Sequence, residues 1–209
     1  MKPFVITIGR RIGAGGLETA HLLAETFGIR MYDRELLNEV AKASGMSPEI
    51  FERSDEKAAK RGLNGFFGIR LFSHVNESLT TSDITSDDTL FKMQCDVMQQ
   101  IADKESCIFV GRCADYVLRD RENVLNVFIT ASMEDRVARM VRSHGWTEDE
   151  AVRFIEQNEK KRANYYNYFT FKKWGDSASY DLCIDSSKLG SIEAVVEQIK
   201  FFMKQTNMI

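Results

Sequence analysis

The sequence predicts an α/β fold in which helices cover both faces of a mostly parallel sheet. Five short segments are apolar throughout instead of alternating, as is typical of strands buried on both faces. Helical patterns separate these segments, and a strand–helix–strand order favours parallel pairing. A glycine-rich stretch directly follows the first segment. The predicted strands are residues 4–8, 29–32, 107–111, 125–130 and 180–185.

Capping residues mark three helix starts. Ser191 precedes the most regular apolar stripe of the chain, which predicts a C-terminal helix. Thr147 and Glu150 form a capping box that opens a helix toward Tyr165. Serine followed by proline at 47–48 predicts a further start. Apolar stripes indicate two more helices, one through Leu17, Ala20, Leu23, Ala24 and Phe27, the other through Met133, Val137, Met140 and Val141.

The length of 209 residues suits one domain that carries an insertion. Residues 59–88 contain three glycines and then a run rich in Ser, Thr and Asp, which indicates a loop or a mobile insertion. The sequence has no internal repeat and no second set of strands. We therefore expect a single domain over residues 1–209.

Composition argues against several classes of partner. The 28 basic and 31 acidic residues give a net charge of -3, so neither nucleic acid nor an anionic membrane is broadly attracted. No apolar run is long enough to cross a bilayer, and the N-terminus lacks a signal pattern. The four cysteines form no CxxC pair and are expected to be buried thiols. We expect a cytoplasmic protein that binds small molecules, and the sequence carries no signal of its oligomeric state.

The stretch GRRIGAGG lies between the first strand and the first helix, where parallel-sheet proteins bind phosphate. It has more glycines than a tight turn requires, so we interpret it as a phosphate loop. The Walker A pattern G-x-x-x-x-G-K-[ST], aligned on Gly15, finds Arg10 at the first glycine and Gly16 at the lysine. Leu17 stands at the hydroxyl position. Only one of the four fixed positions agrees.

A dinucleotide-binding loop is the competing interpretation. The pattern G-x-G-x-x-G matches at Gly13 and Gly15, and Asp33 follows at about the expected twenty residues. Glu18, however, stands at the last glycine. Phosphoryl transfer needs several cations at one place, whereas hydride transfer does not. The candidate cations flank strand ends or lie in a late helix: Arg10, Arg11, Arg112, Lys160, Lys161 and Arg162.

Five blocks, in this order, resemble the cytidylate kinase-like family: ITIGRRIGAGG, YDRELL, FVGRCADYVL, NVFITASMEDRVARM and KKRANYYNYFTFKKWGDSASYDLCIDSSKLG. The resemblance spans nearly the whole chain. It implies a three-layer P-loop NTPase fold of the nucleoside monophosphate kinase type, with a five-stranded parallel sheet. It also implies a monophosphate-binding insertion at 59–88, a lid at 153–178, and use of ATP with Mg²⁺.

The resemblance carries roles to individual residues. GAGG at 13–16 lies on the GAGK of the kinases, so Gly16 stands where they have the loop lysine. FVGR at 109–112 lies on a monophosphate-binding Gly-Arg-Asp segment of the kinases, but Cys113 stands in place of the aspartate, and Asp115 is the candidate for that carboxylate. Asp33 is suited equally to a ligand contact and to capping the helix that begins at Arg34. The implied catalytic cations are Arg10, Lys161 and Arg162; ATP phosphates meet Arg11, Gly13, Ala14, Gly15 and Gly16; the monophosphate meets Asp33, Arg112 and Asp115.

The metal has no evident protein ligand in the loop. Leu17 lacks the hydroxyl that helps to hold Mg²⁺ in P-loop proteins, and Thr19 lies on another face of the helix. We therefore expect phosphates and water to hold the ion.

The resemblance implies transfer of the ATP γ-phosphoryl group to a pyrimidine nucleoside monophosphate such as CMP or dCMP. Two alternatives keep the fold: an ATP-dependent kinase of another small acceptor, and a nucleotide-binding protein without turnover. A nicotinamide dinucleotide enzyme is a third alternative, which Glu18 and the unexplained cations disfavour.

Overall fold

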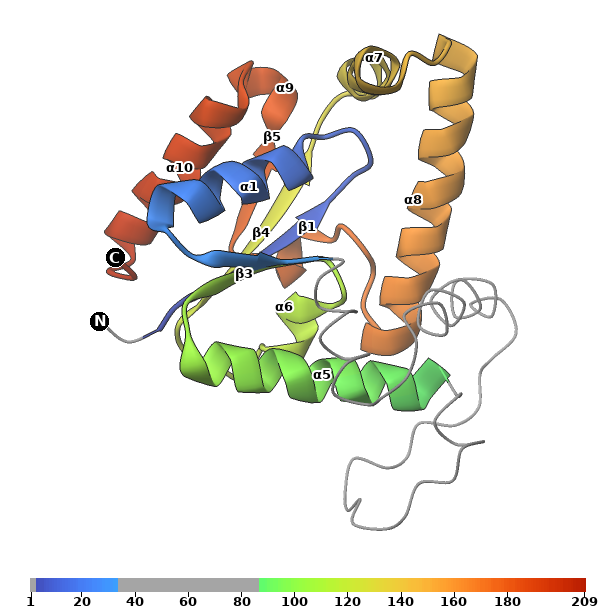
Figure 1. Ribbon diagram of the computed structural model, residues 1–209. Coiled ribbons are helices and arrows are strands. Elements are labelled where there is room, and N and C mark those ends of the chain that lie inside the picture. Colours follow the sequence, from blue (N-terminus) through green and yellow to red (C-terminus); the bar gives the residue numbers. More distant parts are fainter. Residues whose placement is uncertain (1–2, 34–86) are drawn as a thin grey trace.

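A five-stranded parallel sheet forms the centre of the protein, which a computed structural model describes over residues 3–33 and 87–209 (Figure 1). Every neighbouring pair of strands is parallel. The prediction of five strands is confirmed, although β1 extends to Arg10 and β5 begins two residues later than predicted. The strands lie in the order β2 (Arg30–Tyr32), β3 (Cys107–Val110), β1 (Val5–Arg10), β4 (Val124–Thr130) and β5 (Leu182–Asp185).

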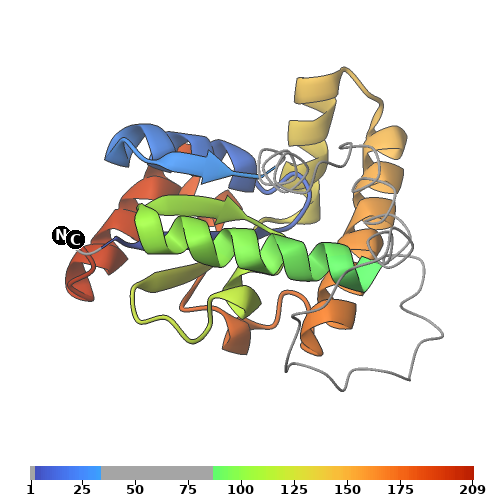
Figure 2. The same cartoon turned by 60° about the horizontal axis from the view of Figure 1, so that its bottom comes forward.

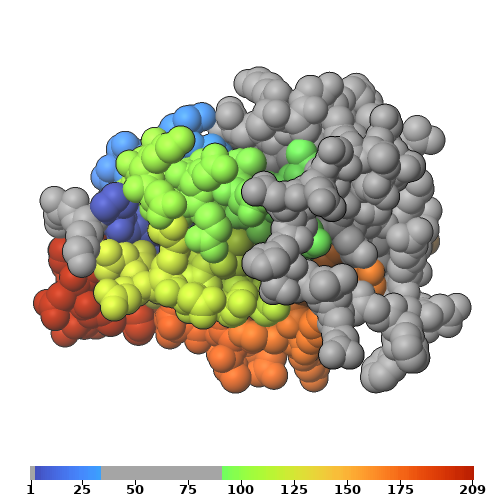
Figure 3. Space-filling view, turned by 90° about the horizontal axis from the view of Figure 1, so that it is seen from below, coloured from blue at the N-terminus to red at the C-terminus, as the bar shows by residue number. Residues whose placement is uncertain are grey.

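Helices cover both faces of the sheet. On one face lie α1 (Gly16–Phe27) and α10 (Ile192–Gln205), which contact each other, with α9 (Ser186–Leu189) leading into α10. On the other lie α5 (Asp87–Lys104) and the short α6 (Ala114–Val117) (Figures 1 and 2). Seen from below, α5 in green and the chain around α6 in yellow-green cover that face (Figure 3).

The two faces explain why the strand sequences are apolar throughout. Val5 and Phe109 belong to the core beneath α5, whereas Ile6 and Ile108 belong to the core beneath α1 and α10. Successive side chains of a strand point to opposite faces, so a strand covered on both faces buries its polar residues too, and they need a partner. The buried Thr7 hydroxyl of β1 donates to the Asn126 side-chain oxygen of β4 at 2.8 Å.

Helices α7 (Met133–His144) and α8 (Glu148–Thr170) stand beyond the carboxyl ends of the strands, and a single 3-10 turn, η1 (Ser177–Ser179), precedes β5 (Figures 1 and 2). The predicted capping box is present, because Thr147 and Glu150 bond each other's backbone N–H groups. The Ser191 hydroxyl accepts from the Ala194 N–H at 3.1 Å. Helix α8 runs past Tyr165 because its last turns bury aromatic side chains.

Other expectations meet the structure only in part. The helix starts predicted at 34 and 47–48 lie outside the described residues, as does the insertion except for residues 87–88, which open α5. Cys107 is a buried thiol, and burial raises its pKa to about 12. Cys183 is exposed, so the expectation of buried thiols is wrong there; it lies on an edge strand. In residues 3–33 and 87–209, every helix is too short or too polar to cross a bilayer.

Candidate active site

The glycine-rich loop between β1 and α1 is enclosed by two other helices. Gly13 and Gly15 have φ of 75° and 82°, a region that side chains disfavour. A Cβ on Gly13 would stand 2.8 Å from the Arg136 carbonyl oxygen of α7, and one on Gly15 2.5 Å from the Ile192 side chain of α10. The glycines therefore serve close packing as well as backbone conformation.

The loop ends in the N-terminus of a long helix. Within residues 3–33 and 87–209 no side chain caps α1, whose N-cap is Gly15, so in this part of the chain the first N–H groups of the helix have no side-chain acceptor. Helix N-termini attract anions through these N–H groups and the helix dipole. Within the loop itself, the Ala14 N–H already donates to the Arg11 carbonyl at 3.3 Å, so the N–H groups at the start of α1 are the ones that face outward.

Arg10, the last residue of β1, extends across Gly16 and brings its guanidinium to Gly111 and Asp33. Its Nη2 lies 3.7 Å from an Asp33 carboxylate oxygen, and its side chain is only 15% exposed. Burial lowers the pKa of Arg10; Asp33 opposes this shift, and the charge of Arg112 adds to it. Arg10 thus lies at the carboxyl end of the sheet, facing both β2 and β3.

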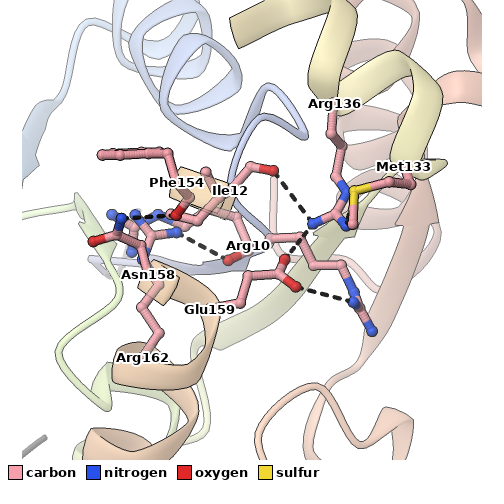
Figure 4. Close-up of polar contacts among 9 residues, drawn as sticks. Arg10, Ile12, Met133, Arg136, Phe154, Asn158, Glu159 and Arg162 are labelled. Atoms are coloured by element: carbon pink, nitrogen blue, oxygen red, sulfur yellow. Dashed lines mark hydrogen bonds and ion pairs between the residues drawn. The ribbon is translucent and has the colours of Figure 1, made fainter. Parts of the chain in front are cut away.

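Arg162 reaches the same place from α8. Its Nη1 donates to the Arg10 carbonyl oxygen at 3.2 Å (Figure 4). Burial, followed by the charge of Arg10, lowers the pKa of Arg162 to about 9, against the opposing effects of Asp33 and Glu159. We call Arg10, Arg112, Arg162 and Asp33 the strand-end cluster, in which three guanidinium groups lie close enough to repel one another.

Arg112 enters this cluster from a strained turn after β3. Gly111, Arg112 and Cys113 all have positive φ, at 76°, 57° and 57°, and the Ala114 N–H donates to the Gly111 carbonyl at 3.2 Å. A left-handed conformation costs a residue with a side chain about 1–2 kcal/mol. The Arg112 guanidinium carbon lies 5.8 Å from the centre of the Tyr165 ring. The turn thus directs Arg112 toward α8.

A second group of charges ties the loop to α8. Glu159 bonds Arg136 with one carboxylate oxygen and lies 3.4 Å from Arg11 Nη1 with the other. Arg136 is 4% exposed and also donates to the Ile12 carbonyl at 3.4 Å (Figure 4). We call Arg11, Arg136 and Glu159 the loop–helix cluster.

Arg136 had no predicted role, although the sequence contains a signal for it. It lies three residues after Met133 and four before Met140, on the apolar stripe of α7. Its Nε is buried and has no partner among the described residues. An arginine on a buried stripe indicates a charged partner inside the fold, and that partner is Glu159.

Besides Arg11, two charged residues of the predicted site stay outside the strand-end cluster. Lys161 is exposed on α8, because one step along a helix turns the side chain by about 100° from Arg162. Asp115 accepts a hydrogen bond from the Tyr166 hydroxyl at 2.6 Å, and burial raises its pKa despite that bond. The structure thus gives Asp115 a contact between α6 and α8.

The loop offers magnesium no hydroxyl. Thr19 is buried, and its Oγ1 donates to the Gly15 carbonyl at 2.8 Å inside the helix. Leu17, at the position of the usual hydroxyl, has no oxygen in its side chain. These residues do not fit an ion bound by the loop.

The parallel sheet, the loop after β1 and the arginine-bearing helix over it define a P-loop kinase fold. An uncharacterized protein from Eubacterium ventriosum is similar, with a TM-score of 0.71 and 27% identity, over 96% of this chain and 98% of that one. Shikimate kinase from Bacteroides thetaiotaomicron shares the fold, with a TM-score of 0.54 and 14% identity, over 96% and 98% of the two chains.

The chain belongs to the cytidylate kinase-like family, whose model matches residues 5–188. Curated relatives include cytidylate kinases from Methanosarcina mazei, 28% identical over 88% of this chain and 87% of that protein, and from Methanopyrus kandleri, 25% identical over 88% and 85%. The predicted fold and family are confirmed, and both are those of phosphotransferases.

Proposed function

We propose that the protein transfers the γ-phosphoryl group of ATP to a pyrimidine nucleoside monophosphate such as CMP or dCMP. One observation carries the proposal: three guanidinium groups converge at the carboxyl end of the sheet, beside a loop with open N–H groups. The family and the cytidylate kinases among its relatives support this acceptor class.

Convergence of like charge indicates an anionic ligand. Asp33 is the carboxylate that acts on both Arg10 and Arg162 among the described residues, and Glu159 acts on Arg162 as well, yet burial and the neighbouring guanidinium groups still lower the pKa of both arginines. Such an arrangement costs stability in the empty protein. Two phosphate-bearing substrates would offset that cost, because phosphoryl transfer brings several negative oxygens to one place.

The loop and the arginines bind different phosphate groups. The N–H groups of Gly13, Gly15 and Gly16 hold the donor phosphates, and Arg11 stands beside them. The Ala14 N–H donates to the Arg11 carbonyl at 3.3 Å instead. Arg112 holds the acceptor phosphate, and Arg162 stabilises the transferring group from α8. Arg10 lies between the two sides, next to Asp33.

The chemical step needs no general base. An oxygen of the monophosphate, already ionised at neutral pH, attacks the γ-phosphorus of ATP. The bond from that phosphorus to the β–γ bridging oxygen breaks, and ADP leaves with the electron pair. Positioning and charge neutralisation carry the catalysis in reactions of this kind.

The test is to incubate the protein with Mg-ATP and a panel of nucleoside monophosphates, shikimate and gluconate, and to follow ADP release. Calorimetry measures binding of each component, and a reaction without acceptor reports ATP hydrolysis. Acceptor-dependent ADP release with CMP or dCMP is expected. Release with a non-nucleotide acceptor alone would support a kinase of another substrate. ATP binding without release for any acceptor would support a protein that binds without turnover.

A further inference from the structure

The side chain of Arg10 lies between two glycines that leave it room. A Cβ built on Gly16 would stand 2.5 Å from the Arg10 Cβ and 2.7 Å from its Cγ. At the other end, a Cβ on Gly111 would stand 2.2 Å from the Arg10 Nη1. All three distances are far shorter than any van der Waals contact between such atoms.

The clash at Gly16 cannot be relieved by a change of rotamer. Each Cβ is fixed by its own backbone, so turning the Arg10 side chain leaves the two Cβ atoms 2.5 Å apart. Either β1 and α1 separate, or one of the two positions lacks a side chain. At this spacing, positions 10 and 16 accommodate a side chain on one of them only.

These two positions are the first glycine and the lysine of the Walker A pattern. Here the first holds arginine and the second holds glycine. We infer that the loop has exchanged its glycine and its cation, so that Arg10 is the phosphate-loop cation and Gly16 the glycine that makes room for it. The inference deepens the proposed function and rests on it for the identity of the ligand.

The exchange also moves the charge. The Arg10 guanidinium lies against Gly111, directly before Arg112, and 3.7 Å from Asp33. It therefore stands between the donor loop and the acceptor arginine, where the phosphoryl group passes. Asp33 acts as a positioning residue that holds this guanidinium.

A stability cycle tests the steric part without any need for activity. Replacing glycine by alanine in a helix usually stabilises a protein. Gly16→Ala should nevertheless lower the melting temperature by about 3 °C or more, because the new methyl group meets Arg10. In an Arg10→Gly background the same change should leave the melting temperature level or raise it. An equal effect of Gly16→Ala in both backgrounds would overturn the inference.

A second cycle tests the exchange of the cation. Arg10→Gly should weaken Mg-ADP binding about tenfold or more, and Gly16→Lys alone should lower both the affinity and the melting temperature. The double variant Arg10→Gly/Gly16→Lys restores the Walker A arrangement and should bind more tightly than either single variant. A double variant no better than Arg10→Gly would contradict the exchange.

The two cycles separate this inference from the proposed function. If no acceptor supports ADP release but the double variant recovers binding, the proposed reaction fails and the exchanged loop stands. If CMP is phosphorylated but both cycles are additive, the reaction stands and the exchange fails.

Discussion

The two arginine clusters of this protein each include a residue of α8, and they differ in how their charge is balanced. In the loop–helix cluster, both oxygens of Glu159 meet cations, and Arg136 gains the Ile12 carbonyl as well. In the strand-end cluster, Arg10 lies 3.7 Å from Asp33, and the charge of Arg10 helps to lower the pKa of the neighbouring Arg162. Glu159 and Arg162, one turn apart on α8, belong to different clusters (Figure 4).

The difference separates arginines that hold the fold from arginines that meet a ligand. A buried arginine paired with a carboxylate and a carbonyl is held within the fold, so its replacement is expected to lower stability. Arginines gathered against one another are stabilised by an added anion, so their loss is expected in binding or turnover. Substitutions at Arg162, Glu159 and Arg112 test this division, and one at Asp115 tests a contact outside both clusters.

Arg162→Ala should have the largest effect. An arginine that meets charge in the transition state is worth about a thousandfold or more in rate, so kcat should fall by that factor while calorimetry finds ATP affinity within about threefold. Lys161→Ala, at the exposed neighbouring position, is the comparison and should cost far less. An equal loss in both variants would assign the predicted lid cation to Lys161 as well.

Glu159→Gln should act mainly on stability. It leaves Arg136, 4% exposed, without its carboxylate, which is expected to lower the free energy of unfolding by about 2 kcal/mol in urea titrations. Glu156→Gln, on the exposed side of the same helix, is the control and should change it by less than about 0.5 kcal/mol. Unchanged stability with a tenfold or greater loss of turnover would place Glu159 in the active site.

Two substitutions at Arg112 separate its charge from its strained backbone. Arg112→Gly and Arg112→Ala both remove the guanidinium and should raise the KM for the monophosphate alike. Glycine adopts the φ of 57° without strain, so its variant should be more stable than the alanine variant by about 1 kcal/mol. Equal unfolding free energies would show that the turn is not strained.

Asp115→Asn should have the smallest effect, and one that depends on pH. Burial raises the pKa of Asp115 in the folded state, so the folded protein holds this proton above the unfolded value of about 3.9. The stability of the wild-type protein therefore falls as pH rises from the unfolded pKa toward the raised folded pKa, because the folded state must give up the bound proton. The amide of the variant has no proton to lose. Unfolding titrations from about pH 4 to pH 8 should favour the variant increasingly.

The opposite slope would contradict a raised pKa. Because Asp115 bonds Tyr166, the KM for the monophosphate should stay near the wild-type value. A marked rise in KM would instead support the acceptor role that the family resemblance implied for this carboxylate.

Much of the fold could be predicted because its signals are local. The apolar segments became the five strands, and Thr147 and Ser191 cap the helices that they were predicted to open. A cap bonds an N–H group two or three residues away, and a buried strand needs apolar residues on both faces, so short stretches suffice for both. The end of α8 was missed because tertiary burial of its aromatic side chains decides it.

The candidate site was predicted in part. The loop and the cations Arg10, Arg112 and Arg162 were identified by their positions after strands or in the resembling blocks, and the fold brings these three together. Arg136 was missed although its place on the apolar stripe of α7 is a local signal, because its partner Glu159 lies on another helix. The contact of Asp115 with Tyr166 has no local signature. Which face of α8 meets the loop depends on the packing of α7 and α8.

By itself, the sequence determined the parallel sheet, the glycine loop after its first strand and the family to which the chain belongs. Only the tertiary structure decided which charges meet: Arg162 bonds the carbonyl of a residue 152 positions away, and Arg10 passes over the glycine that stands for the loop lysine. Local hydrogen bonds and burial patterns fix elements within a few residues. The Cβ spacing that lets only position 10 or position 16 carry a side chain arises only when strand and helix pack together.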